Sequence, residues 1–281
     1  MKTVTAMAAK WLSKFLTKDF RDIFGSGHDD VAERLGALAR STVECLARSD
    51  ALYHNLEHTV LVTLVGRDIL RGRMMCERLE PTDYDHLIAA CLLHDIGYVR
   101  GVLKGDSETE FVVDQGGRKV SLARGASDAS LAPYHIERSM MFVQERMGNS
   151  PTLDAARLMR SIEFTRFPAP AAHVGDFVDR EPRLVQAADL IGQLGDPLYP
   201  RKANALFYEF EEIGANRQLG YSSPADLIEK YPAFFWNSVA MHLGEATNYL
   251  NLTASGRQWI ANLHHHVMCA EHAFRFMGPQ R

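Results

Sequence analysis

The chain has 281 residues, of which 46% are hydrophobic, and this predicts a substantial core rather than general disorder. Its 31 basic and 35 acidic side chains give a formal charge of −4, so the basic excess typical of proteins that bind large nucleic acids is missing. No segment reaches the roughly 18 uncharged apolar residues of a membrane span. The four cysteines are widely spaced and form no CxxC pair, which indicates a reducing compartment, and we expect a cytoplasmic protein.

The first predicted element is an amphipathic helix within residues 1–27. Apolar side chains from Trp11 to Phe24 recur at helical spacing, and charged side chains such as Lys14 and Lys18 fall on the other side. These lysines also interrupt the apolar residues, so we do not expect a secretory signal. We expect this helix to pack on its own domain, with contact to a second copy or to a membrane surface as the alternatives.

The rest of the chain is also predicted to be helical. Apolar spacing favours helices at residues 54–74, 82–96, 134–147, 152–165, 182–194, 201–217, 233–252 and 256–276. The exception is the stretch 101–133, in which residues 111–113 and 119–122 could form a small hairpin within a long loop. Long loops in compact domains are usually functional or mobile, so we expect this one to act as a lid.

We therefore predict one all-α domain over residues 1–281. Its parts are the N-terminal helix, a metal-binding core at residues 50–200 and a helical extension at residues 201–281. No internal repeat and no linker rich in proline or serine separates two domains.

His94 and Asp95 end a continuous apolar run, Leu87–Leu93. Such a run is typical of a buried helix. Ionisable side chains are seldom buried unless they are paired or coordinate a cation. We therefore expect a metal ion at this pair.

Two other apolar segments carry the same residue types. His54 and His58 are four residues apart on a predicted helix, which would place their Cβ atoms about 5–6 Å apart, and Asp189 lies in a third segment. A lone HxxxH also occurs in zinc proteases, but there a glutamate follows the first histidine. Here that residue is Asn55, so we exclude a protease of that type.

Imidazole and carboxylate ligands together suit manganese, iron, zinc, nickel or, with more water, magnesium. The identity of the metal and its number, one ion or two, remain open. The two oxygens of Asp95 could bridge two cations about 3.5–4 Å apart and hold a hydroxide between them as the nucleophile. Such a centre also neutralises charge on phosphoryl oxygens, as hydrolysis of a phosphate ester requires.

The order His58, His94–Asp95, Asp189 resembles the HD-domain superfamily of metal-dependent phosphohydrolases. The resemblance covers roughly residues 50–200. It implies an HD-type helical bundle in which these four residues are the metal ligands.

The segment Tyr53–His58 (YHNxxH) is similar to the signature of the cyclic nucleotide phosphodiesterases within that superfamily. In those enzymes the first histidine protonates the leaving oxygen and the second binds metal. The resemblance therefore implies that His54 is the general acid and His58 a ligand. An imidazole suits this role because its ordinary pKa lies near 6.5.

The chain also departs from the relatives. It has no further histidine shortly after the His-Asp pair, and residues 163–168 replace the His-His-Glu run and Gly-Tyr-Pro of the branch that cleaves cyclic dinucleotides. Both departures argue against those cyclic substrates. His135 falls where several superfamily members place a ligand of a second metal, and Glu163 could supply another. The alternatives are a histidine with a local hydrogen bond and a surface or paired carboxylate.

Lys104 is the preferred candidate for binding a substrate phosphate, because it lies on the expected lid just beyond the His-Asp pair. The alternative is a solvated surface charge. We do not expect a site at His28–Asp29, which lies in a glycine-rich turn, or at His264–His266. Consecutive side chains on a helix point about 100° apart, so three in a row do not converge.

The sequence thus predicts a metal-dependent phosphohydrolase acting on a small phosphorylated substrate, of nucleotide type, with a homodimer left open. One alternative is an HD-type di-iron oxygenase acting on a small polyol or phosphonate, which would need His135 and a further histidine such as His173 as ligands. The other is a non-catalytic signalling module.

Overall fold

The structure is a computed structural model that describes residues 3–169 and 180–276. Within these residues nearly all regular structure is helical, and the single sheet has two short strands, which confirms the predicted all-α fold. The helices are α1 (Val4–Phe24), α2 (Asp29–Leu46), α3 (Leu56–Met74), α4 (Pro81–Leu93), α5 (His135–Met147), α6 (Ala155–Glu163), α7 (Arg180–Leu194), α8 (Tyr199–Glu212), α9 (Ala215–Leu219), α10 (Pro224–Glu229), α11 (Tyr231–Phe234), α12 (Gly244–Leu250) and α13 (Ala254–Phe276). The strands are β1 (Glu110–Val112) and β2 (Lys119–Ser121).

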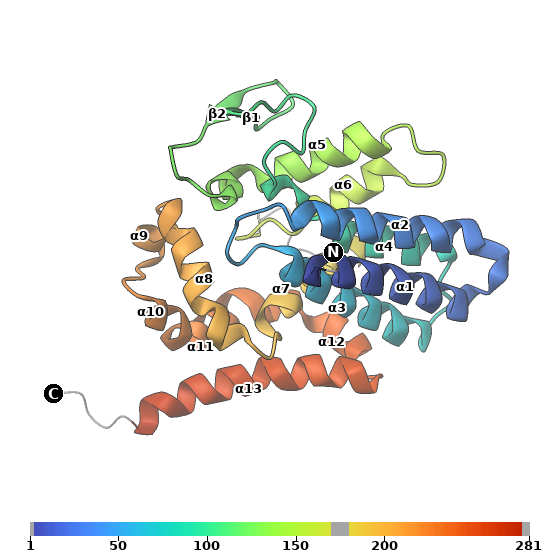
Figure 1. Cartoon of the computed structure of the whole chain (residues 1–281). Coiled ribbons are helices and arrows are strands. Elements are labelled where there is room, and N and C mark those ends of the chain that lie inside the picture. Colours follow the sequence, from blue (N-terminus) through green and yellow to red (C-terminus); the bar gives the residue numbers. More distant parts are fainter. Residues whose placement is uncertain (1–2, 170–179, 277–281) are drawn as a thin grey trace.

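The helices form a bundle with a C-terminal group at one side (Figure 1). α1 pairs with α2 in the outer layer, α3, α4 and α7 pack on one another, and α6 contacts α4, α5 and α7. The larger cluster of buried apolar side chains extends from Ala9 in α1 to Val267 in α13. Residues of the predicted extension therefore pack on the same core as the predicted metal-binding region. None of the described helices combines the length and the apolar character needed to cross a membrane.

The start of α3 differs from the prediction of a helix over residues 54–74. α3 begins at Leu56, because the side chain of Asn55 caps it by accepting a hydrogen bond of 2.9 Å from a backbone N–H of the first turn. His54 therefore precedes the helix and does not share a helical face with His58, which corrects the expected HxxxH geometry.

Two C-terminal helices are also shorter than predicted. The helix expected over residues 201–217 ends at Glu212, and Gly214 follows with a φ of 72°, a conformation that favours glycine. The helix expected over residues 233–252 is interrupted by a π-helical turn at Phe235–Val239 and a 3₁₀ turn. α12 then starts at a glycine, which has low helix propensity.

The loop at residues 101–133 contains the predicted hairpin. β1 and β2 are antiparallel, with Phe111 opposite Val120. Near the end of the loop, Glu212 of α8 accepts hydrogen bonds from the backbone N–H of Ser127 at 2.7 Å and from its hydroxyl at 2.6 Å. No described hydrogen bond or ion pair joins the hairpin to the His-Asp pair, so a lid function remains a prediction.

Arg138 of α5 fixes the segment that follows the His-Asp pair. Its side chain is fully buried and forms an ion pair of 2.9 Å with Asp106. It also donates hydrogen bonds to three backbone carbonyls, those of Gly97, Val99 and Val112, at 2.7, 3.0 and 2.5 Å. The start of the long loop is thereby held against α5.

Gly97 gives a test of this packing, because a side chain there has no room. A Cβ atom at Gly97 would lie 2.0 Å from the carbonyl oxygen of His135 and 2.6 Å from the backbone nitrogen of Ser139. We expect Gly97→Ala to lower the free energy of unfolding by at least about 2 kcal/mol, as overpacking does, in urea unfolding followed by circular dichroism. Gly27→Ala is the matched control, since a Cβ there meets no atom within 4 Å. Equal stability of both variants would refute the close approach.

Candidate metal centre

The end of α4 positions His94 and Asp95. The helix begins with a capping box between Glu80 and Asp83 and is buried from Tyr84 to its last residue. The ring nitrogen Nδ1 of His94 lies 2.9 Å from the carbonyl oxygen of Cys91 and donates to it. The lone pair of Nε2 is therefore directed away from the helix, which is how metal-binding histidines are commonly oriented.

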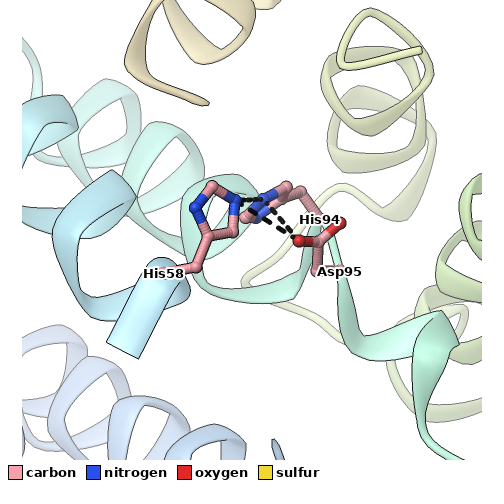
Figure 2. A group of neighbouring side chains, drawn as sticks. All are labelled: His58, His94 and Asp95. Carbon is pink, nitrogen blue, oxygen red and sulfur yellow. Dashed lines mark hydrogen bonds and ion pairs between the residues drawn. The ribbon is translucent and has the colours of Figure 1, made fainter. Parts of the chain in front are cut away.

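Four side chains from three elements converge on this point. His58 comes from α3, His94 and Asp95 from the end of α4, and Asp189 from α7. Figure 2 shows the two imidazoles and the Asp95 carboxylate facing one another. The Nε2 atom of His58 lies 3.3 Å from Nε2 of His94, 3.4 Å from Oδ2 of Asp95 and 3.1 Å from Oδ1 of Asp189. Nε2 of His94 lies 3.2 Å from the same Asp95 oxygen and 3.5 Å from the same Asp189 oxygen.

These separations fit a common cation. Ligand bonds of about 2.0–2.2 Å that meet at angles of about 90–110° place neighbouring donor atoms roughly 3.0–3.5 Å apart. Among the described residues, His58, His94 and Asp95 also form the group of buried side chains suited to hold a metal ion. We call the four converging residues, His58, His94, Asp95 and Asp189, the ligand cluster.

The charges in the ligand cluster also fit a cation. Burial raises the pKa of the Asp95 carboxyl, but the neighbouring imidazoles, His94 foremost, lower it overall, and the same balance lowers the pKa of Asp189. Burial lowers the pKa of His94, yet the two carboxylates raise it well above its ordinary value. Oδ2 of Asp95 is buried without a hydrogen-bond partner among the described residues. The cluster therefore favours positive charge at its centre.

His135 faces the other oxygen of Asp95. Its Nδ1 donates to the carbonyl of Ala132 at 2.6 Å, which leaves the lone pair of Nε2 directed toward Oδ1 of Asp95 at 3.7 Å. Burial lowers the pKa of His135, so the imidazole is neutral near pH 7. Two lone pairs that face each other at this distance are suited to share a second cation. The geometry is thus compatible with Asp95 as a bridging ligand.

His54 is held by a carboxylate that the sequence analysis did not single out. Oε2 of Glu209, in α8, lies 2.5 Å from Nδ1 of His54, and Oε1 accepts the backbone N–H groups of Tyr53 and His54 at 2.6 and 3.1 Å. Burial lowers the pKa of His54, but the charge and hydrogen bond of Glu209, together with the charges of Asp95 and Asp189, outweigh it and raise the pKa to about 9. His54 is therefore protonated at neutral pH.

Tyr98 lies between two histidines of the site. Its ring stacks on His54 at a centroid distance of 4.9 Å and an interplanar angle of 7°, and on His135 at 4.5 Å and 27°. Tyr98 is itself buried, with 3% of its surface exposed, because it ends the short helix Ile96–Tyr98 under α5. One tyrosine thus sets the spacing between the predicted general acid and the predicted ligand of a second metal.

A family model described as Npun_R2479-like matches residues 3–273. The chain belongs to the Npun_R2479-like family. The matched range of this family includes α1, the ligand cluster and Glu209. No curated protein matches the sequence.

The described hydrogen bonds of two other predicted site residues, Glu163 and Lys104, are made outside the ligand cluster. Both carboxylate oxygens of Glu163 bond to Arg166, at 2.8 and 2.9 Å, and Arg166 also bonds to Glu137 at 2.8 Å. Lys104 is exposed, and its backbone N–H donates to Glu145 at 3.1 Å. No described hydrogen bond or ion pair joins Glu163 or Lys104 to the cluster. Glu163 is therefore a paired carboxylate, the alternative that the sequence analysis gave for it, and its partner is Arg166.

Three C-terminal histidines of the described residues do not join the site. His264, His265 and His266 diverge as expected: the first packs near Phe235, the second lies beside Cys269, and Nε2 of the third lies 2.9 Å from the carbonyl oxygen of Asp196. His173, which the oxygenase alternative would need, lies outside the described residues.

The sequence pattern could have indicated Glu209 as a paired residue, but it could not have indicated Tyr98 as part of the site. Glu209 stands close to Leu206 and Phe207, buried apolar residues of α8, and only 4% of its own surface is exposed. An acidic residue on an apolar helix face needs a partner, so the pattern marks Glu209 as paired without naming its partner. Tyr98 lies three residues after Asp95, and its sequence context is typical of an ordinary aromatic residue of the core.

Proposed function

We propose that this protein is a metal-dependent phosphohydrolase that cleaves a small phosphate ester or phosphodiester, of nucleotide type. The observation that carries the proposal is the convergence of two imidazoles and two carboxylates with donor atoms 3.1–3.5 Å apart. Beside them lies His54, which Glu209 keeps protonated. Ligand cluster and proton donor together are the two parts that hydrolysis of a phosphate ester needs.

Each part of the site has a separate role in this proposal. A divalent ion, when bound by the ligand cluster, supplies Lewis acidity and lowers the pKa of water towards about 7. His58, His94, Asp95 and Asp189 would hold it; the first three are buried, and the side chain of Asp189 is 19% exposed. His54 gives its proton to the leaving oxygen. Glu209 keeps that imidazole in place and protonated before the reaction.

A small cavity beside His58 is suited to a small polar group. It has a volume of about 90 Å³, and its lining includes Asn55, Glu57 and Lys202. The Lys202 amine lies 2.8 Å from Oε1 of Glu57 and 2.6 Å from Oδ2 of Asp196. Pockets for whole drug-sized ligands have about 300–1,000 Å³, so the cavity does not hold a complete nucleotide. The nucleotide type of the substrate therefore rests on the resemblance of the Tyr53–His58 segment to the phosphodiesterase signature.

The test is metal analysis followed by turnover. We expect protein purified without chelator to contain one or two equivalents of a transition metal per chain, and to hydrolyse bis(p-nitrophenyl) phosphate or a nucleotide from a substrate panel. Chelation should abolish turnover, and added manganese should restore it. Protein without bound metal and without turnover in manganese would overturn the proposal in favour of a signalling module. Iron in two redox states with oxygen uptake on a polyol or phosphonate would favour the oxygenase.

A further inference from the structure

α1 has a second apolar face that the bundle does not cover. Its buried face, Ala9, Leu12, Leu16 and Phe20 among others, packs in the core next to α2. Val4, Met7 and Trp11 are exposed instead, by 77, 54 and 49%. They are three and four residues apart and so form one stripe along the helix. Figure 1 shows α1 in the outer layer of the bundle beside α2.

The exposed stripe has a defined end. The Trp11 ring stacks on the half-buried Phe15 ring, at a centroid distance of 5.2 Å and an interplanar angle of 14°. The guanidinium of Arg67, from α3, lies 5.1 Å from the centre of the Phe15 ring. The stripe formed by Val4, Met7 and Trp11 therefore passes from the N-terminal turn of α1 to the point where α1 meets α3. We call these three residues the α1 stripe.

A row of lysines lies next to the α1 stripe. Residues 1–18 contain four lysines and no acidic residue, although the whole chain has a net charge of −4. Lys10, Lys14 and Lys18 are exposed and four residues apart, so they share one face of α1. Lys14 and Lys18 each follow a stripe residue by seven positions, which on a helix is a rotation of only about 20°. The apolar stripe and the positive row are thus neighbours.

We propose that α1 binds to an anionic lipid surface through this face. A helix in the membrane interface buries apolar side chains among the lipids while its lysines contact anionic headgroups. Tryptophan is favoured at the boundary between water and lipid, and the long lysine side chains reach the headgroups while their methylenes stay apolar. All three features are present along the first four turns of α1.

The lysine charges argue against a second copy of the chain as the partner that covers the α1 stripe. A two-fold interface through the α1 stripe would place the same patch on both sides. Lys18 already pairs with Asp22, and the rows of Lys10 and Lys14 would then approach each other with no carboxylate within residues 1–18 to pair with them.

The experiment is vesicle flotation of the full chain. We expect the wild type to float with vesicles of phosphatidylcholine and phosphatidylglycerol at low salt, not to float with phosphatidylcholine alone, and to dissociate as salt is raised. Trp11→Glu should lower the bound fraction at least about tenfold, because it removes the largest apolar side chain and adds a charge of the lipid's sign. Lys10→Glu with Lys14→Glu should do the same. Trp236→Glu is the matched control, since Trp236 is exposed by 53% in the C-terminal part.

Thermal unfolding of each variant, compared with the wild type, checks that the substitution leaves the fold intact. Absence of flotation of the wild type at low salt would overturn the proposal, and so would an equal loss in Trp11→Glu and Trp236→Glu. Light scattering gives a third outcome: a dimer that Trp11→Glu dissociates would assign the stripe to a second copy. Retention on polyglutamate without vesicle binding would assign it to an acidic protein. None of these readings depends on hydrolase activity, so this inference and the proposed function fail separately.

Discussion

Replacing Asp95 with alanine is expected to remove both the metal and the hydrolytic activity. The Oδ2 atom of Asp95 lies 3.4 Å from Nε2 of His58 and 3.2 Å from Nε2 of His94, while Oδ1 faces His135 at 3.7 Å. We expect metal content to fall at least about tenfold, since even loss of a supporting partner costs 10–100-fold in affinity. Turnover should fall at least about a thousandfold, because Lewis-acid stabilisation is worth several kcal/mol. Elemental analysis and the initial rate on bis(p-nitrophenyl) phosphate measure the two effects.

Two further variants make this result specific. Glu163→Gln should keep the full metal content, because both oxygens of Glu163 already bond to Arg166; loss of metal would restore Glu163 as a ligand. His135→Ala should lose one ion of two if Asp95 bridges two cations, and lose none if the ligand cluster holds one. Full metal occupancy in Asp95→Ala, with a native circular dichroism spectrum, would refute the role of Asp95.

The sequence indicated His58, His94, Asp95 and Asp189 as candidate ligands because each of them interrupts an apolar segment. His94 and Asp95 follow a run that is buried from Leu87 to Leu93, and a buried ionisable pair needs a partner. Their meeting with His58 and Asp189 depends on how α3, α4 and α7 pack, which helical spacing alone does not specify. The prediction that these four side chains meet came from the resemblance to the HD-domain superfamily.

Contacts between distant elements are the part that the sequence did not reveal. Glu209 bonds to His54 across 155 positions, and no local pattern connects two such residues. The position of His54 also depended on a local competition. The Asn55 side chain caps α3, so the backbone of His54 is left outside the helix and free to bond to α8. Apolar periodicity predicts a helix but does not locate its first residue when a cap lies within the pattern.

The same limit explains the two faces of α1. Helical spacing identified its apolar positions without showing which of them the core covers. Leu12 and Leu16 are buried, whereas Trp11, one position before Leu12, is 49% exposed. Adjacent positions differ by about 100° around the helix, so packing against α2 covers one set and leaves the other. The uncovered set, which includes Trp11, is the face through which we propose that α1 contacts a lipid surface.

Glu209→Gln is expected to lower turnover without removing the metal. The Glu209 carboxylate, against the effect of burial, raises the pKa of His54, and the charges of Asp95 and Asp189 add to this shift. A divalent cation at the ligand cluster offsets the charges of Asp95 and Asp189, which leaves Glu209 as the main cause of the shift. Glutamine still accepts the backbone N–H groups of residues 53 and 54, but it carries no charge. We expect turnover at pH 7 to fall about fourfold and further at higher pH, because an imidazole with the ordinary pKa near 6.5 is only about one quarter protonated at pH 7.

The pH profile separates this effect from a structural one. A general acid must be protonated, so activity should decline as the pH rises through the folded-state pKa of His54, which Glu209 raises above its ordinary value. In Glu209→Gln that decline should move to lower pH, towards the ordinary value near 6.5. Glu212→Gln is the matched control, because Glu212 is in the same helix but bonds to Ser127 of the long loop. An unchanged alkaline limb in Glu209→Gln, or an equal loss of turnover in both variants, would show that His54 does not protonate the leaving group.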